Sequence, residues 1–228
     1  MKEGIEQSGN SSNYRWYVLL LVSFTFFFTN AERMCLPVLF LEILRDLDLS
    51  LVQVGMVWGM DPLAGVFVSI FSGLLIDRFG VKRTVTVIIF FVGVFGLLRG
   101  LSFNFVSLAG SMFLFGLLVA TTPTILPKVI ALWFKGRHLG LANGISICSA
   151  STGAMASTML SATLLSPFLG GWRFVLFLYG LPPILMCLIW FITYRDYGEP
   201  GSQGIMGNTV SFRKALSHVF RIKDAWAL

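Results

Sequence analysis

Six long runs of apolar residues constrain this chain more than any other feature of its sequence. A helix of about 20 apolar residues crosses the hydrocarbon core of a bilayer. In lipid, only helices and closed barrels satisfy every backbone N–H and C=O group, and these runs are continuous rather than alternating. The sequence therefore predicts an all-α membrane protein with six transmembrane helices. The expected spans are residues 16–41, 51–76, 84–101, 105–134, 140–166 and 174–194.

Charge is scarce along the chain. Only 12% of the residues are charged, 56% are hydrophobic, and the mean hydropathy is +0.80, whereas a soluble domain carries about 25% charged residues. The three cysteines, Cys35, Cys148 and Cys187, fall within expected spans and show no metal-ligand spacing. No nucleotide-binding loop and no catalytic Ser/His or paired-Asp motif is present. We therefore expect no cofactor, no metal and no enzyme activity.

The basic residues predict the orientation of the spans. With the N-terminus inside, twelve of the 17 Lys and Arg residues face the cytoplasm, as the positive-inside rule requires. Arg45, Arg99 and Arg173 are then expected outside. The net charge of +6 thus indicates membrane topology rather than a nucleic-acid partner. We expect a multi-pass protein of the plasma membrane with both termini in the cytoplasm. The twelve inner residues are Lys2, Arg15, Arg78, Lys82, Arg83, Lys135, Arg137, Arg195, Arg213, Lys214, Arg221 and Lys223.

The chain divides into a cytoplasmic tail (1–15), a transmembrane bundle (16–194) and a cytoplasmic segment (195–228). Within the last segment, residues 212–221 form a basic amphipathic pattern, which is typical of a helix against the anionic inner leaflet. The apolar residues 225–228 are interpreted as the start of a truncated seventh span. A Leu-Pro pair at Pro37 recurs at Pro127, in spans of opposite direction. This echo indicates a 3+3 inverted repeat.

The most specific local pattern lies in the short loop between the second and third spans. It has the spacing G-x-x-x-D-R-x-G-x-K-R, formed by Gly73, Asp77, Arg78, Gly80, Lys82 and Arg83. Gly80 permits a tight reversal, and Asp77 can cap the following helix. A positive-inside turn with a helix-breaking glycine is the simpler interpretation. The complete spacing resembles the signature loop of the major facilitator superfamily, where it latches the two six-helix halves together in the outward-facing state.

Further stretches carry the same resemblance over nearly the whole of residues 16–194. They include Leu126-Pro127-Lys128, Trp133-Phe134, Gly140 to Gly144, and Gly170-Gly171-Trp172-Arg173. The resemblance implies the N-terminal six-helix half of a transporter, most similar to porters of small anions such as cyanate and nitrate. One departure concerns the fourth span, where the superfamily often carries an Arg four residues before a Gly. Here Met112 precedes Gly116, so proton coupling through that Arg is not implied.

Three charged residues, Glu32, Arg33 and Asp61, fall deep within the expected spans. Each costs about 2.5–3.5 kcal/mol at the bilayer centre, so each should face a partner or a cavity. Arg33 and Asp61 both lie about 15 Å from the outer ends of their spans at ~1.5 Å per residue, which predicts an ion pair. Glu32 is rotated from Arg33 by about 100° and is expected to face elsewhere. Asp61-Pro62 is expected to interrupt the second span, as in helices that line transport sites.

Two interpretations of the Arg33–Asp61 pair stay open at this point. The pair could serve only the packing of the first two spans. Alternatively, Arg33 attracts an anionic substrate in a cavity, with Asn30, about one turn earlier, adding a hydrogen bond. Glu32 and Asp61 are then candidate proton carriers. Lys128 lies near the inner face and is expected to snorkel to the headgroups, with substrate contact as the alternative.

The sequence thus predicts half of a secondary active transporter for a small anionic solute, working by alternating access. Its expected partners are the lipid bilayer, the solute, and a second six-helix bundle, either a missing C-terminal half or another copy. The alternative is a truncated, non-transporting six-span fragment that acts as a scaffold or regulatory subunit or is inactive.

Overall fold

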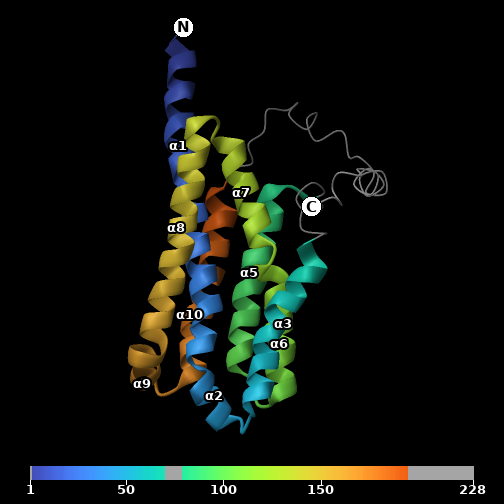
Figure 1. Cartoon of the computed structure of the whole chain (residues 1–228). Helices are drawn as coiled ribbons and strands as arrows, with labels where there is room; N and C mark the ends of the chain where they lie inside the picture. The colour runs from blue at the N-terminus through green and yellow to red at the C-terminus, as the bar shows by residue number, and fades with distance from the viewer. Residues whose placement is uncertain (1, 70–78, 195–228) are drawn as a thin grey trace, which may run out of the picture. The chain divides into compact units, whose positions relative to one another are not determined.

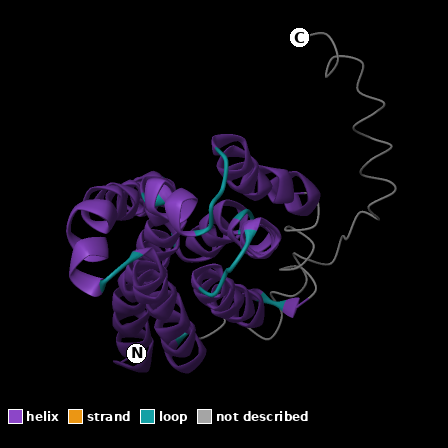
Figure 2. Ribbon diagram, turned by 90° about the horizontal axis from the view of Figure 1, so that it is seen from below, coloured by secondary structure: helices purple, strands orange, loops and turns teal. Residues whose placement is uncertain are grey.

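The structure, a computed structural model, describes residues 2–69 and 79–194 (Figure 1). All regular elements in these two ranges are helices (Figure 2). The predicted all-α fold is therefore confirmed. Several predicted features lie outside the described residues, namely Gly73, Asp77 and Arg78 of the signature loop and the amphipathic segment 212–221.

Within the described ranges, five helical stretches are long and apolar enough to cross a bilayer: Tyr14–Val38, Leu51–Val68, Val81–Gly100, Phe105–Trp133 and Trp172–Thr193. The remaining long helix, α8, has 24 residues, about 36 Å at ~1.5 Å per residue, but Gly, Ser and Thr lower its hydropathy. The sixth span therefore stays a prediction. In order, the elements are α1 (Lys2–Val38), α2 (Phe40–Asp46), α3 (Leu51–Ser69), α5 (Val81–Gly100), α6 (Phe105–Val119), α7 (Thr122–Trp133), α8 (Arg137–Leu160), the π-helical turn η1 (Ser161–Leu165), α9 (Ser166–Leu169) and α10 (Trp172–Thr193).

Helix continuity differs from the sequence prediction at two places. The fourth span was predicted as one helix, but it divides between α6 and α7, and Pro123 stands in the first turn of α7. Proline is favoured there because the first N–H groups of a helix have no intrahelical acceptor. Conversely, α3 continues through Pro62, where an interruption was predicted. A single proline removes only one backbone hydrogen bond, and neighbouring packing can hold the helix together.

The packing of the helices has the symmetry expected of an inverted repeat. α1 packs against α8 and α10, whereas α6 packs against α3 and α5, and α5 packs against α10 (Figure 1). Exchanging the first three spans for the last three converts the α1–α8 contact into α6–α3 and the α1–α10 contact into α6–α5. The two prolines do not mark equivalent breaks, because α1 ends at Val38 just after Pro37, whereas α7 continues past Pro127 to Trp133. The packing is thus consistent with the repeat, but the prolines are not its markers.

Close approach of α1 and α8 depends on Gly153. A Cβ atom built on Gly153 would overlap the backbone of Phe27 in α1, and Ser146 and Ser157 on the same helix are also buried. Small residues of this kind permit tight helix packing in membranes. A Cβ atom at Gly144 would meet nothing within 4 Å. The packing of α8 therefore requires glycine at Gly153 but not at Gly144.

Polar contacts tie the ends of the spans together. At one end, Asp46 of α2 accepts hydrogen bonds from Trp172 Nε1 at 3.2 Å and Arg173 Nη1 at 2.5 Å. Arg173 Nη2 also donates to the backbone carbonyl of Ser102 at 3.0 Å. At the other end, the Tyr14 hydroxyl donates to the carbonyl of Thr193 at 2.9 Å. One end of α10 is thus joined to α1 and the other to α2, which follows α1.

Candidate functional site

The structure contains the predicted ion pair between Arg33 of α1 and Asp61 of α3. The Arg33 Nε atom lies 2.6 Å from Asp61 Oδ2. The two side chains differ in exposure, since 30% of the Arg33 side chain but only 2% of the Asp61 side chain is accessible. α1 packs mainly against α8 and α10, and α3 packs against α6. The ion pair therefore joins two groups of helices.

Asp61 lies where α3 packs closely against α6. A Cβ atom built on Gly116 of α6 would lie 2.8 Å from the Cα atom of Asp61, so α3 and α6 meet closely at this residue. Arg33 is the more accessible partner, and its guanidinium carries five N–H donors in a planar fork. Among the described residues, only its Nε–H has an acceptor. The remaining N–H groups can bind a carboxylate or another oxyanion.

Replacing Gly116 with alanine should disturb this site through packing alone. The added methyl group would push against Asp61, and overpacking of this kind costs about 1–3 kcal/mol. Gly110 on the same helix is the matched control, because a Cβ atom there meets nothing within 4 Å and alanine favours helix by up to ~1 kcal/mol. Thermal unfolding of the detergent-purified chain, followed by circular dichroism, should show a lower melting temperature only for Gly116→Ala. Equal effects at the two positions would contradict the close approach.

Asn30, which was predicted to assist substrate binding, makes one side-chain hydrogen bond within its own helix. Its side-chain Nδ2 donates to the backbone carbonyl of Phe26 at 2.9 Å. The second N–H group and the carbonyl oxygen of this side chain make no hydrogen bond among the described residues. The residue lies about one turn from Arg33, so its predicted contact with substrate stays a prediction.

Glu32 turns away from Arg33, as its rotation on the helix predicted, and faces Arg99 of α5. Glu32 Oε1 lies 3.7 Å from Arg99 Nη2, and both side chains are 0% exposed. Arg99 was counted among the outer basic residues, but its side chain is buried within the bundle, which was not predicted. A guanidinium near a helix end can turn inward where a carboxylate and an aromatic face receive it, and the Arg99 guanidinium lies 3.8 Å from the ring centroid of Phe115. Gly96 leaves the space for Glu32, since a Cβ atom there would overlap the carboxyl.

The partnership of Glu32 and Arg99 was missed, although the sequence carried a signal for it. Arg99 lies within the expected third span, 84–101. A charge within a span needs a partner, and this rule applies to Arg99 as it does to Glu32. Gly96, about one turn before Arg99, marks the helix face that could accommodate a large side chain from another span.

The described part of the signature loop consists of its second half. Gly80 precedes α5 with φ of 78°, a left-handed conformation that glycine adopts without strain. Lys82 Nζ lies 5.5 Å from the ring centroid of Phe191 on α10, and Arg83 is exposed. Lys128 is exposed on α7. The predicted latch and the snorkelling of Lys128 both stay predictions.

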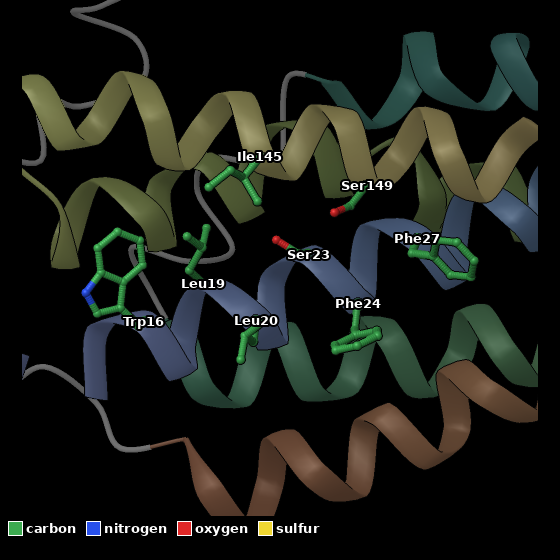
Figure 3. Close-up of a pocket in the computed structure, with 8 residues that line it drawn as sticks. All are labelled: Trp16, Leu19, Leu20, Ser23, Phe24, Phe27, Ile145 and Ser149. Atoms are coloured by element: carbon green, nitrogen blue, oxygen red, sulfur yellow. The ribbon is translucent and has the colours of Figure 1, made fainter. Parts of the chain in front are cut away.

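A separate apolar hollow lies between α1 and α8 (Figure 3). Its volume is about 400 Å³, and Ser23 and Ser149 are its only polar lining residues. A second hollow of about 630 Å³ continues along α8 from Gly140 to Thr152. Neither includes Arg33 or Asp61, and an apolar lining suits a neighbouring helix or lipid better than an anion. The first hollow is lined by Trp16, Leu19, Leu20, Ser23, Phe24, Phe27, Ile145 and Ser149.

Sequence comparison relates the chain to known transporters. Residues 21–228 match the family described as the Major Facilitator Superfamily. The chain is 27% identical to the probable galactarate/D-glucarate transporter of Bacillus subtilis (strain 168), over 84% of this chain and 43% of that protein. It is 29% identical to the probable nitrate/nitrite antiporter of Thermus thermophilus, over 82% of this chain and 44% of that protein. The chain thus spans about half the length of these curated relatives.

Structural comparison gives the same fold. A bacterial homolog of the human lysosomal transporter Spinster, solved in an inward-facing and occupied conformation, superposes with a TM-score of 0.68. The sequence identity is 20%, and the match covers 84% of this chain and 46% of that one. At this identity the likeness concerns the fold alone.

Proposed function

The chain belongs to the major facilitator superfamily, and we propose that it forms the N-terminal half of a secondary active transporter for a small anionic solute. Its family and its curated relatives are transporters. The predicted membership of the major facilitator superfamily is therefore confirmed. The solute, the mechanism and the partners are proposals.

The main support for an anionic solute is the unequal exposure of the Arg33 and Asp61 side chains. The Asp61 side chain is buried, whereas the Arg33 side chain is 30% exposed and uses only one of its N–H donors among the described residues. Arginine binds carboxylates and other oxyanions through two parallel N–H···O bonds. The relatives are named for galactarate, D-glucarate, nitrate and nitrite, all of which are anions. We therefore assign the first contact with the solute to Arg33, assisted by Asn30.

The same pair supports coupling to protons. An anion bound to Arg33 competes with Asp61 for the guanidinium, and a buried carboxylate without its cation is costly to keep charged. Uptake of one proton by Asp61 removes that cost. Glu32, one residue before Arg33, is the second candidate proton carrier, and its side chain is buried like that of Asp61. Solute and proton would then cross together as the bundle alternates between inward- and outward-facing states.

A second six-helix bundle is the proposed partner. Its place is supported by the apolar hollows along α1 and α8, where Leu20 and Phe24 are more than half exposed. Transport sites of this architecture lie near the midplane between two bundles. The distribution of basic residues supports cytoplasmic termini, and the signature loop, including Gly80, Lys82 and Arg83, would latch the two bundles on that side.

Transport assays in proteoliposomes test this proposal. The chain is reconstituted alone and joined to a second six-helix bundle, and uptake of labelled D-glucarate and nitrate is measured. We expect solute movement only in the joined form, because one bundle supplies only half of the lining of the site. Uptake by the lone monomer would overturn the half-transporter view. Absence of uptake in both forms would favour the non-transporting scaffold.

A further inference from the structure

The Glu32 carboxyl is unusual among the buried polar groups of the bundle. Both of its oxygens are inaccessible and have no hydrogen-bond donor within the described ranges. Buried carboxylates are normally satisfied by hydrogen bonds, because burial without a partner is costly. The nearest opposite charge, Arg99 Nη2, lies 3.7 Å from Oε1. Charge attraction rather than a hydrogen bond therefore links the two groups.

Arg99 is positioned by contacts other than the Glu32 carboxyl. Its Nη2 donates to the backbone carbonyl of Glu32 at 3.1 Å, and its guanidinium lies 3.8 Å from the ring centroid of Phe115. Its Nη1 lies 3.9 Å from the Met112 sulfur. These contacts do not depend on whether the carboxyl is charged. The guanidinium therefore presents a fixed positive charge to Glu32.

From this arrangement we infer that Arg99 is the positioning residue for a proton-carrying Glu32. The inference rests on the proposed function. Met112 occupies the position at which the superfamily often carries an arginine, and here the guanidinium reaches that position from α5 instead. A proton taken up by Glu32 neutralises the carboxyl while Arg99 keeps its other contacts. Protonation thus releases the charge attraction between α1 and α5.

The neighbouring residue supplies the link to solute. Glu32 ties α1 to α5, and Arg33 ties the same turn of α1 to α3. A proton at Glu32 and an anion at Arg33 would therefore each release one of two charge contacts of that turn. With both released, α1 loses its ion pairs to α3 and α5 and keeps the hydrogen bond from Arg99 to the Glu32 carbonyl. Coupled transport of a proton and an anion requires that the binding of both acts on the same helix.

Few other ionisable groups act on Glu32 in the described part of the bundle. Cys35 follows one turn later in α1, and Tyr179 of α10 is close enough to Cys35 to interact with it. From α6, the neighbours around the guanidinium are Met112 and Phe115, which carry no charge. Arg99 is therefore the one charged residue that faces Glu32 in the described ranges.

Infrared titration of the detergent-purified chain tests the inference directly. The carbonyl stretch of protonated Glu32 is identified as the band that disappears in Glu32→Gln, and its intensity is followed with pH. An opposite charge within about 4–6 Å favours the charged carboxylate by about 1–3 pH units. In Arg99→Met the midpoint of the band should therefore rise by about one pH unit or more, whereas Arg99→Lys should largely restore it. An unchanged midpoint in Arg99→Met would overturn the inference.

A stability cycle decides the case in which Arg99→Met melts at a measurable temperature but is too unstable for the titration. Removal of one partner of a buried pair leaves an uncompensated charge, whereas removal of both does not. The double variant Glu32→Gln/Arg99→Met should therefore melt at a higher temperature than Arg99→Met alone. If the double variant is no more stable, Arg99 serves packing only and the inference fails. Failure of the proposed function is seen separately, as absence of solute uptake by the unsubstituted chain when it is joined to a second bundle.

Discussion

Replacing Arg33 with alanine should weaken binding of the transported anion to the joined transporter by about 30-fold to several-thousand-fold. The reason is that truncating one member of a buried, charge-assisted hydrogen bond costs about 2–5 kcal/mol, and ~1.4 kcal/mol is a factor of ten. Arg33 is the accessible member of the pair with Asp61, so its loss removes the cation that faces the solute. Isothermal titration calorimetry on the purified protein measures the change.

Two controls separate binding from folding. Alanine at Arg33 leaves Asp61 buried without a cation, which destabilises the fold by about 3–5 kcal/mol. The double variant Arg33→Ala/Asp61→Asn removes both charges and should recover much of the melting temperature without recovering the affinity. Arg33→Lys keeps the charge but loses the planar fork, so its affinity should be intermediate. If Arg33→Ala binds the anion as tightly as the native protein, the pair serves packing alone.

Glu32→Gln should abolish accumulation driven by a pH gradient while exchange of solute across the membrane continues. Glutamine keeps the shape of the side chain but cannot carry a proton. A gradient of one pH unit is worth ~1.4 kcal/mol per proton, which corresponds to about tenfold accumulation. In the variant, the internal concentration should stop at the external one. Proteoliposomes with an imposed pH gradient, compared with counterflow of labelled solute, give both quantities.

Glu42 provides the matched control for this substitution. It lies on α2, beyond Pro37, and its carboxylate accepts a hydrogen bond from the Ser166 hydroxyl. Glutamine can accept the same bond, so Glu42→Gln should leave accumulation intact. Asp61→Asn distinguishes the two candidate carriers. Loss of accumulation in Asp61→Asn but not in Glu32→Gln would assign the proton to Asp61.

The sequence predicted the helices and one of the two buried ion pairs for clear physical reasons. Apolar runs of spanning length have no alternative to helix in lipid. Arg33 and Asp61 could be paired because both lie on long spans at the same distance from the outer ends. The direction of Glu32, away from Arg33, followed from helical rotation alone.

The burial of Arg99 was not predicted, because distance along a span says nothing of which way a side chain turns. Its position near the end of α5 suggested the surface, yet Phe115 and Glu32, from two other spans, enclose it. The local course of the backbone at proline also depends on packing. α3 continues through Pro62, next to the point where Asp61 packs closely against Gly116 of α6. The fourth span instead divides before Pro123. No local pattern distinguishes these two prolines.

The central claim, that this bundle recognises a negative charge through Arg33, is tested most directly by paired solutes. Binding of D-glucarate and nitrate to the joined transporter is measured by calorimetry, each beside an uncharged analogue of similar size. Hydrogen bonds to charged groups contribute about 1.5–3 kcal/mol, so the transported anion should bind about tenfold to 150-fold more tightly than its analogue. An uncharged analogue that binds as tightly as its anion would contradict the claim.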